Sequence, residues 1–201
     1  MKKILLLLII FGLMDHTTFC LAEQQDGIIK KYYPNGKLEA EETYKEGKQE
    51  GISKYYFESG GLRAEVNFKN GKENGITRHY NGEGKLTSAW NYENGDLKGR
   101  REYYENGALE AEIDFEGESK FFSGIQKLYY ENGMLKAEIP HKNGYLIGVR
   151  REYYPTGRLW KEETFQYNED HEYSELVHIK EYDETGGIVT DKDVQIPSIL
   201  R

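Results

Sequence analysis

The residues best able to make specific contacts in this sequence are tyrosines that recur at a nearly constant interval. Each is followed six residues later by a leucine. Tyrosine combines a large apolar ring with a polar hydroxyl and is enriched in protein interfaces. A row of such side chains with charged neighbours is a candidate surface for a protein partner; alternatively, the rings stack on one another and cover a thin sheet. The candidate residues are Tyr32, Tyr56, Tyr80, Tyr103, Tyr129 and Tyr153.

Histidines and carboxylates could support acid–base catalysis or metal binding, but their spacing favours neither. His79, His141, His171 and His178 are spread along the chain without the short fixed spacing of a zinc site. The recurring glutamates are expected to face basic residues, and a carboxylate beside a lysine keeps a low pKa and is a poor general acid. No Ser/His/Asp order, phosphate-binding loop or dinucleotide motif occurs. The sequence therefore predicts no catalytic residue, no metal, no cofactor and no enzymatic activity.

An internal repeat positions these side chains. Counting the first glycine of each unit as position zero, units begin near residues 27, 51, 75, 99, 124 and 148, and a partial unit begins near 177. Position five is tyrosine and position eleven is leucine in all six full units, once a one-residue deletion after Gly99 is allowed for. Units of 24 or 25 residues are too small to bury a core alone and must stack on their neighbours.

Each unit is predicted to be a β-hairpin. After the leucine, apolar residues occupy every second position, as in Leu62, Ala64, Val66 and Phe68, which is typical of a half-buried strand. A second glycine group then turns the chain into the next unit: Gly47, Gly71, Gly95 and Gly144. The fold class expected is all-β: an elongated, single-sheet antiparallel meander of six to seven hairpins. The glycines expected to form the hairpin turns are Gly36, Gly107, Gly133 and Gly157.

The charges test the hairpin register. A two-residue type I′ turn at Asn35-Gly36 places the basic residue at position three, Lys30, directly opposite the acidic residue at position fourteen, Glu41. This is the register we predict. A three-residue loop with a bulge is the alternative, and it would face Tyr32 toward Leu38.

Two irregularities interrupt the repeat. The segment after Phe115 contains adjacent Phe121 and Phe122, which either begin the next strand or form a contact patch. Residues 166–175 are an acidic and aromatic insertion, expected as a solvated loop or a site for a basic partner. Residues 191–201 are expected to be a C-terminal tail, frayed or forming an edge strand.

Residues 1–22 resemble a secretory signal peptide, with Lys2-Lys3 followed by an apolar run. We expect a signal-peptide helix that is removed, a mature repeat array over residues 23–190, and export to the periplasm, the cell envelope or the medium. A lipid anchor at Cys20 is the alternative.

The net charge argues against a nucleic-acid partner. The formal charge is −8, and it becomes −9 if Lys2, Lys3 and Asp15 leave with the signal peptide. A chain of this sign is repelled by phosphate backbones and by anionic lipid surfaces.

The repeat resembles the variant MORN repeat of the YwqK-type toxin–antitoxin antitoxin family. The resemblance rests on Tyr-Tyr-x-Asn-Gly-x-Leu followed by Gly-x-x-x-Gly, over about residues 27–165 and weakly over 177–189. Trp90 and Trp160 do not occupy the tryptophan position of standard MORN units. The resemblance implies a binding or scaffold module whose partner is a protein, in that family a toxin. A structural or glycan-binding envelope protein is the alternative.

Overall fold

The computed structural model describes residues 26–115, 123–169 and 172–194. The expected signal peptide with Cys20, the Phe121-Phe122 pair and His171 lie outside these residues. All regular structure in the described part is β-strand, and no described helix is long and apolar enough to cross a membrane.

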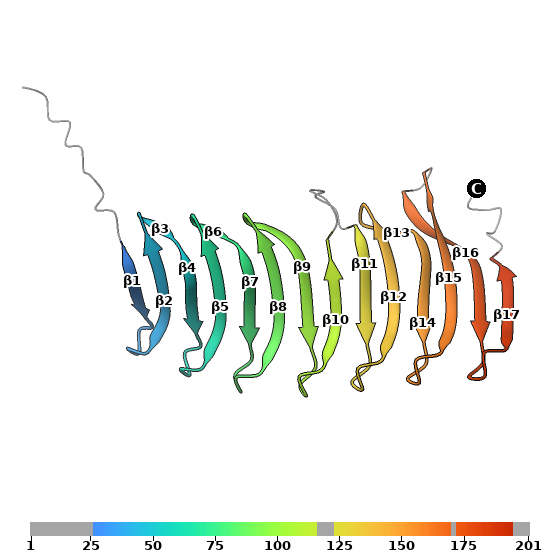
Figure 1. The fold of residues 1–201 in the computed structure, drawn as a ribbon, viewed down its shortest axis with the longest axis horizontal. Helices are drawn as coiled ribbons and strands as arrows, with labels where there is room; N and C mark the ends of the chain where they lie inside the picture. Colours follow the sequence, from blue (N-terminus) through green and yellow to red (C-terminus); the bar gives the residue numbers. More distant parts are fainter. Residues whose placement is uncertain (1–25, 116–122, 170–171, 195–201) are drawn as a thin grey trace, which may run out of the picture.

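The chain forms one open antiparallel sheet of 17 strands (Figure 1). Consecutive long strands pair with one another, and three two-residue strands form short arms at the turns between repeats. The strands are β1 (Gly27–Tyr32), β2 (Leu38–Lys45), β3 (Lys48–Gln49), β4 (Gly51–Tyr56), β5 (Leu62–Lys69), β6 (Lys72–Glu73), β7 (Gly75–Tyr80), β8 (Leu86–Glu93), β9 (Asp96–Tyr103), β10 (Leu109–Asp114), β11 (Gly124–Tyr129), β12 (Leu135–Lys142), β13 (Tyr145–Leu146), β14 (Gly148–Tyr153), β15 (Leu159–Asn168), β16 (Tyr173–Tyr182) and β17 (Ile188–Asp193). The predicted all-β, single-sheet meander is confirmed.

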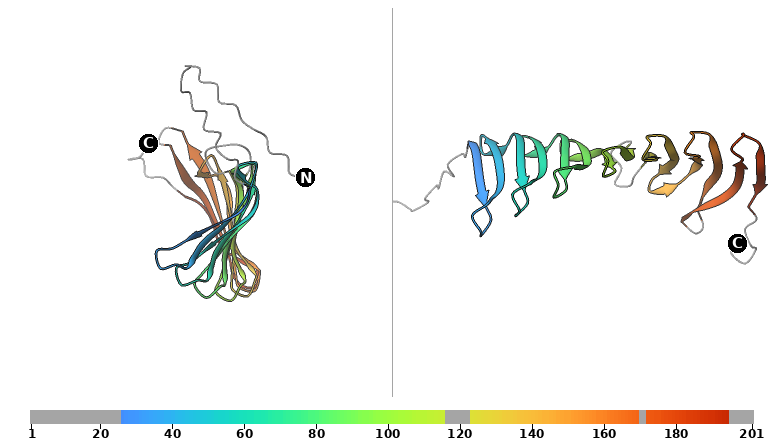
Figure 2. Two further views of the ribbon diagram at one scale, coloured as in Figure 1. Left: turned by 90° about the vertical axis from the view of Figure 1, so that its left-hand side faces the viewer. Right: turned by 90° about the horizontal axis from the view of Figure 1, so that it is seen from below.

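The sheet is a long twisted strip, and no other element of the described chain covers it (Figure 2). The turns within repeats follow one long edge and the turns between repeats follow the other (Figure 1). β1 and β17 stand at opposite ends. Because the meander never folds back, neighbouring repeats supply the long-range contacts of each unit.

One surface of the strip, the buried face, holds small side chains in its centre. Ser53 is fully buried, and Ala40 is only 2% exposed. Ala40 lies opposite Lys31 on one side and Tyr55 on the other, so longer neighbours cover it. The buried face is defined by Ala40, Ser53, Ala64, Val66, Thr77, Ala111, Ile113 and Ala137.

The turn within each repeat differs from the two-residue prediction, which is wrong. The Tyr33 carbonyl accepts a bond from Gly36 N at 2.9 Å, and Tyr33 N donates to Lys37 O at 2.8 Å, which encloses a three-residue loop. Type I′ needs positive φ at both central residues, whereas only Gly36, at φ 82°, has it here. Tyr32 therefore faces Leu38, as expected for the alternative of a three-residue loop with a bulge.

A bulge then restores the predicted charge pairing. The register shifts between Lys31 and Tyr32, so that Lys30 still lies opposite Glu41. Equivalent register shifts occur between Tyr55 and Tyr56 in the second repeat and at the same position in later repeats. The Lys30–Glu41 pairing is confirmed although the turn type is not.

Two-residue turns with positive φ occur instead between repeats. Asn70 and Gly71 have φ of 52° and 80°, and Asn143 and Gly144 have 51° and 85°. Glu46-Gly47 and Asn94-Gly95 follow the same pattern.

The C-terminal irregularities continue the sheet. In the insertion, β15 extends to Asn168 and pairs with Tyr173 at the start of β16, so its described residues form a longer hairpin where a loop was expected. The partial seventh repeat forms the β16–β17 hairpin, and Lys180 lies opposite Asp191. The first three residues of the expected tail, 191–193, belong to β17.

Candidate functional site

The face opposite the buried face carries a repeating tyrosine–glutamate contact. In five repeats the hydroxyl of the position-five tyrosine donates to the position-fourteen glutamate of the preceding repeat. The Tyr129 hydroxyl donates to Glu112 Oε1 at 2.6 Å. The equivalent bonds are Tyr56 to Glu41, Tyr80 to Glu65, Tyr153 to Glu138 and Tyr182 to Glu162, at 2.9 to 3.1 Å.

The same glutamates bind basic side chains. Lys30 Nζ lies 2.9 Å from Glu41 Oε1, and Arg151 Nε lies 3.0 Å from Glu162 Oε1. We call this surface the ladder face. Its central column, read across the sheet, is Lys30, Glu41, Lys54, Glu65, Arg78, Ala89, Arg101, Glu112, Lys127, Glu138, Arg151, Glu162, Lys180 and Asp191.

These contacts fix the protonation of the ladder. Burial raises the pKa of the Tyr129 hydroxyl to about 12, and the bond to Glu112 adds to the effect. Burial and the bonds to glutamate likewise raise the pKa of Tyr56, Tyr80 and Tyr153. Hydrogen bonds from Lys30 and then Tyr56 lower the pKa of Glu41. Near neutral pH these tyrosines are protonated donors and Glu41 is an ionised acceptor.

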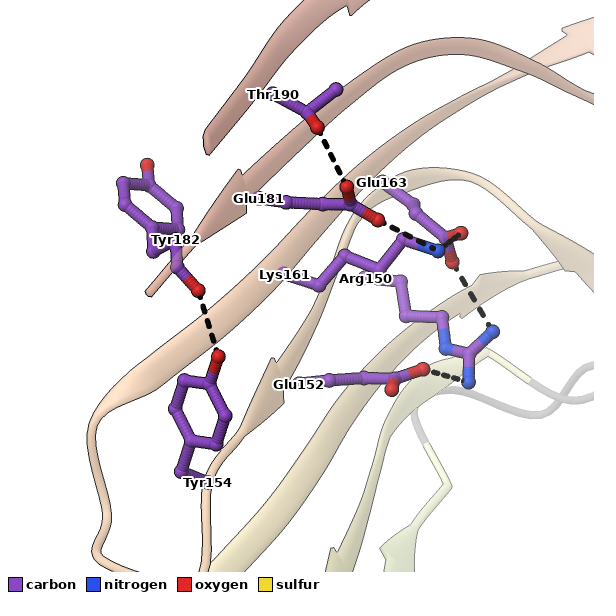
Figure 3. A network of polar contacts seen from close by, with 8 residues as sticks. All are labelled: Arg150, Glu152, Tyr154, Lys161, Glu163, Glu181, Tyr182 and Thr190. Atoms are coloured by element: carbon purple, nitrogen blue, oxygen red, sulfur yellow. Dashed lines mark hydrogen bonds and ion pairs between the residues drawn. The ribbon is translucent and has the colours of Figure 1, made fainter. Parts of the chain in front are cut away.

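The second tyrosine of the Tyr-Tyr pair makes a contact that sequence reasoning missed. Its hydroxyl donates forward to the backbone carbonyl of the next repeat's position-five residue: Tyr33 to Tyr56 O at 2.6 Å, and Tyr130 to Tyr153 O at 2.8 Å. Tyr104 makes the same bond to Tyr129 O. Tyr154 makes it to Tyr182 O (Figure 3). The recurrence of two adjacent tyrosines was the available signal, but the acceptor depends on which strand lies alongside.

The structure places the six predicted tyrosines on the ladder face in one row. Tyr32 is 57% exposed, since no repeat precedes it among the described residues, and the other five are half-buried. Tyr103 is the exception within the row, because Ala89 replaces the glutamate that its hydroxyl would reach. Most of this row joins repeats to one another, and whether it also binds a partner stays a prediction.

An exposed aliphatic stripe runs beside the ladder and was not predicted. Ile28 is 65% exposed, and Ile52 and Ile125 are each 51% exposed. They occupy position one of their repeats and lie opposite Thr43, Asn67 and Pro140, on the ladder face. Ile76 and Val149 continue the stripe, half-buried.

A polar network replaces the apolar residues of the buried face in the sixth and seventh repeats (Figure 3). Arg150 contacts Glu152 and also Glu163, which is 8% exposed, and Lys161 Nζ lies 2.6 Å from Glu163 Oε1. Thr190 Oγ1 donates to Glu181 Oε2 at 2.7 Å.

The histidines of the described residues have separate surroundings. His79 packs against Trp90 in a tilted arrangement with ring centroids 4.8 Å apart, and burial lowers the pKa of His79. His178 lies beside Asp193 and Asp191, whose contacts raise its pKa. Within residues 26–115, 123–169 and 172–194 there is no group of three His, Cys, Asp or Glu side chains able to hold a metal ion.

Comparison with known families gives one match. Five segments fit the profile of a protein family described as MORN repeat variant, and together they cover just over half of the chain: residues 25–46, 49–70, 99–116, 122–143 and 146–167. The unmatched residues between the second and third segments correspond to the third repeat, in which the ladder lacks its glutamate. No curated protein matches the chain.

Proposed function

This chain belongs to the MORN repeat variant family, whose repeats are often protein- or membrane-binding modules, and from that premise we propose that it is a non-enzymatic, exported array that binds a protein through its ladder face. The observation that carries the proposal is the exposed aliphatic stripe of Ile28, Ile52 and Ile125 beside an ordered column of charges. Regularly spaced apolar side chains with a charged rim form the usual pattern of a protein interface.

The ladder chemistry supports binding over catalysis. The glutamates that could act as acids or bases are already shared by a basic residue and a tyrosine, as Glu41 is by Lys30 and Tyr56. A net charge of −8 also disfavours binding to anionic membranes or nucleic acid, and this supports a protein as the partner. In line with the resemblance to antitoxin proteins, the partner we propose is a toxin met outside the cytosol.

Two charge substitutions in the aliphatic stripe test the proposal. Immobilised protein, residues 23–201, is incubated with the envelope and medium fractions of the source cells, and retained proteins are identified by mass spectrometry. We expect the double variant Ile52→Glu/Ile125→Glu to lose the partner. Met134→Glu, which places a charge on another exposed apolar residue, 48% exposed and in a turn, is the matched control and should keep it.

The proposal fails if no protein is retained specifically, or if the stripe variant and the control retain the same proteins equally. The toxin assignment is tested separately, by co-expressing a retained protein with and without this chain. We expect growth to stop without the chain and to resume with it.

A glycan-binding envelope protein is the second candidate, favoured by the exposed Tyr32 ring. It predicts that sugars bind the protein and that a folded Tyr32→Ala/Tyr56→Ala/Tyr129→Ala variant does not bind them. Because the Tyr56 and Tyr129 hydroxyls already donate to glutamates, fewer tyrosine groups are free for sugars than the sequence suggested.

A further inference from the structure

The charge column of the ladder face has one gap, in the third repeat. Basic and acidic residues alternate along the whole column except at Ala89, which occupies position fourteen. On one side Ala89 lies directly opposite Arg78 of β7, and on the other directly opposite Arg101 of β9. Two arginines therefore flank a methyl group at a place where other repeats hold a carboxylate.

The donors around this gap lack the acceptor that their counterparts have. Arg78 is exposed and has no ion-pair or hydrogen-bond partner among the described residues. Arg101 contacts Glu112 and Asp114 on its far side, at 3.4 and 3.8 Å. The Tyr103 hydroxyl likewise has no acceptor in the described part of the chain, whereas Tyr80 and Tyr129 donate to Glu65 and Glu112.

A pocket opens beside Tyr103, at the end of β9. It has a volume of about 360 Å³ and is lined by Leu86, Tyr103, Glu105 and Asn106, among others. Position six, where Tyr33, Tyr104, Tyr130 and Tyr154 bridge to the next repeat, is Asn81 here, as it is Phe57 in the second repeat. The Asn81 side chain instead accepts bonds from Glu83 N and Lys85 N in its own turn. The bridge between the third and fourth repeats is missing, and the space beside Tyr103 stays open.

We infer that this gap binds a carboxylate side chain of the partner protein, held by Arg78 and Arg101 and hydrogen-bonded by Tyr103. The inference rests on the proposed protein-binding function and names the chemistry of one anchor point. Five other repeats show which group this arrangement of donors binds. In each, a glutamate oxygen accepts a hydrogen bond from the tyrosine hydroxyl, as Glu41 and Glu138 do. Arginine suits the role, because its planar fork can bind both carboxylate oxygens. The neighbouring pocket has room for the residue next to the acid.

The site is tested by placing a carboxylate of the protein itself in the gap. Ala89→Glu supplies the missing carboxylate, while Asn91→Glu adds the same charge two residues along β8 on the same face, at an exposed position. The probe is N-acetyl-glutamate α-amide, titrated into ¹⁵N-labelled protein while the Nε–H signals of the arginines are followed by NMR.

We expect the Arg78 and Arg101 signals to shift in the original chain and in Asn91→Glu, with saturation in the millimolar range, which corresponds to two or three hydrogen bonds to a charged carboxylate. In Ala89→Glu the affinity should fall by at least about tenfold, because the internal carboxylate is always present. Equal shifts at all arginines, or unchanged binding by Ala89→Glu, would overturn the site. Tighter saturation by inorganic phosphate would overturn its assignment to a carboxylate.

A partner assay separates this inference from the proposed function. If a partner is retained equally by Ala89→Glu and Asn91→Glu, the protein-binding function stands and the carboxylate anchor is wrong. If the probe binds at the gap but no protein is retained by the original chain, the anion site stands and the protein-binding function is wrong, together with the assignment of the carboxylate to a partner. Circular dichroism of both variants confirms that the sheet is intact.

Discussion

The ladder glutamates explain why tyrosine and a basic residue recur together. Glu112 accepts the Tyr129 hydroxyl and also lies within ion-pair distance of Arg101 and Lys127. One carboxylate thus joins two repeats through three donors, and no single contact needs to be strong. Where the carboxylate is absent, at Ala89, the same donors become available to another molecule.

Removing one ladder hydroxyl should weaken the junction between repeats. We expect Tyr129→Phe to lower the free energy of unfolding by about 1 kcal/mol, since it deletes a hydrogen bond to a partly buried carboxylate. Tyr103→Phe is the matched control at the same repeat position, and because its hydroxyl has no described acceptor, its effect should be near zero. Urea unfolding followed by circular dichroism gives both values. Equal losses would contradict the ladder.

The raised pKa of Tyr129 predicts how this contact depends on pH. The folded-state pKa of about 12 lies above the ordinary value of 10, so the protonated hydroxyl is the stabilising form. Its contribution is fully present below pH 10 and is lost as the pH rises through about 12. Absorbance titration at ~295 nm, with Tyr129→Phe subtracted from the original chain, should show one phenol ionising near pH 12. Ionisation near pH 10 would show that Tyr129 is exposed.

The turn within each repeat depends on one glycine in the left-handed region. Gly133 has φ of 82° and no atom within 4 Å of an added Cβ, so backbone strain, and not a clash, opposes substitution. We expect Gly133→Ala to cost about 1 kcal/mol and Gly133→Asn to cost less, because asparagine tolerates this conformation better. Gly82→Ala is the control, since Gly82 has similar space and no positive φ. It should be neutral or slightly stabilising in the same urea assay.

The polar network in the last repeats should depend on Arg150. Its removal leaves Glu152 and Glu163 close together on the buried face, and we expect Arg150→Ala to cost about 1–3 kcal/mol. Arg100 occupies the same place in the fourth repeat, but it lies opposite Ile113 and Trp90, and among the described residues its ion pair is to the half-exposed Glu102. Arg100→Ala should therefore cost less than about 0.5 kcal/mol. Similar costs would show that the arginine stem, and not its charge, stabilises the strip.

The whole molecule should behave as a rod in solution. Fourteen strands have six or more residues, and at about 4.8 Å per strand the sheet is about 65 Å long. We expect a radius of gyration of about 20 Å for the array by small-angle X-ray scattering, against about 15 Å for a compact domain of similar length. A value near 15 Å would contradict the open sheet. A larger value with doubled mass would show that β1 or β17 pairs with a second copy.

Strand order and repeat boundaries could be predicted from the sequence because their signals are local. Alternating residues such as Leu62, Ala64 and Val66 face one way in any strand, and glycines such as Gly71 permit turns wherever they occur. The pairing of Lys30 with Glu41 followed from the same counting. The turn type could not be predicted, because a bulge and a three-residue loop together produce the same pairing farther along the hairpin.

The contacts between repeats came from the fold. Tyr33 reaches the Tyr56 carbonyl 23 residues away, and that carbonyl lies at the bulge on the neighbouring strand end. Ala89 is an ordinary strand residue in the sequence, and it becomes a gap only when Arg78 and Arg101 lie on either side of it. Residue type and spacing set what each strand can offer. Which group each side chain contacts depends on the position of the next strand, since hydrogen bonds and ion pairs act only over a few ångströms.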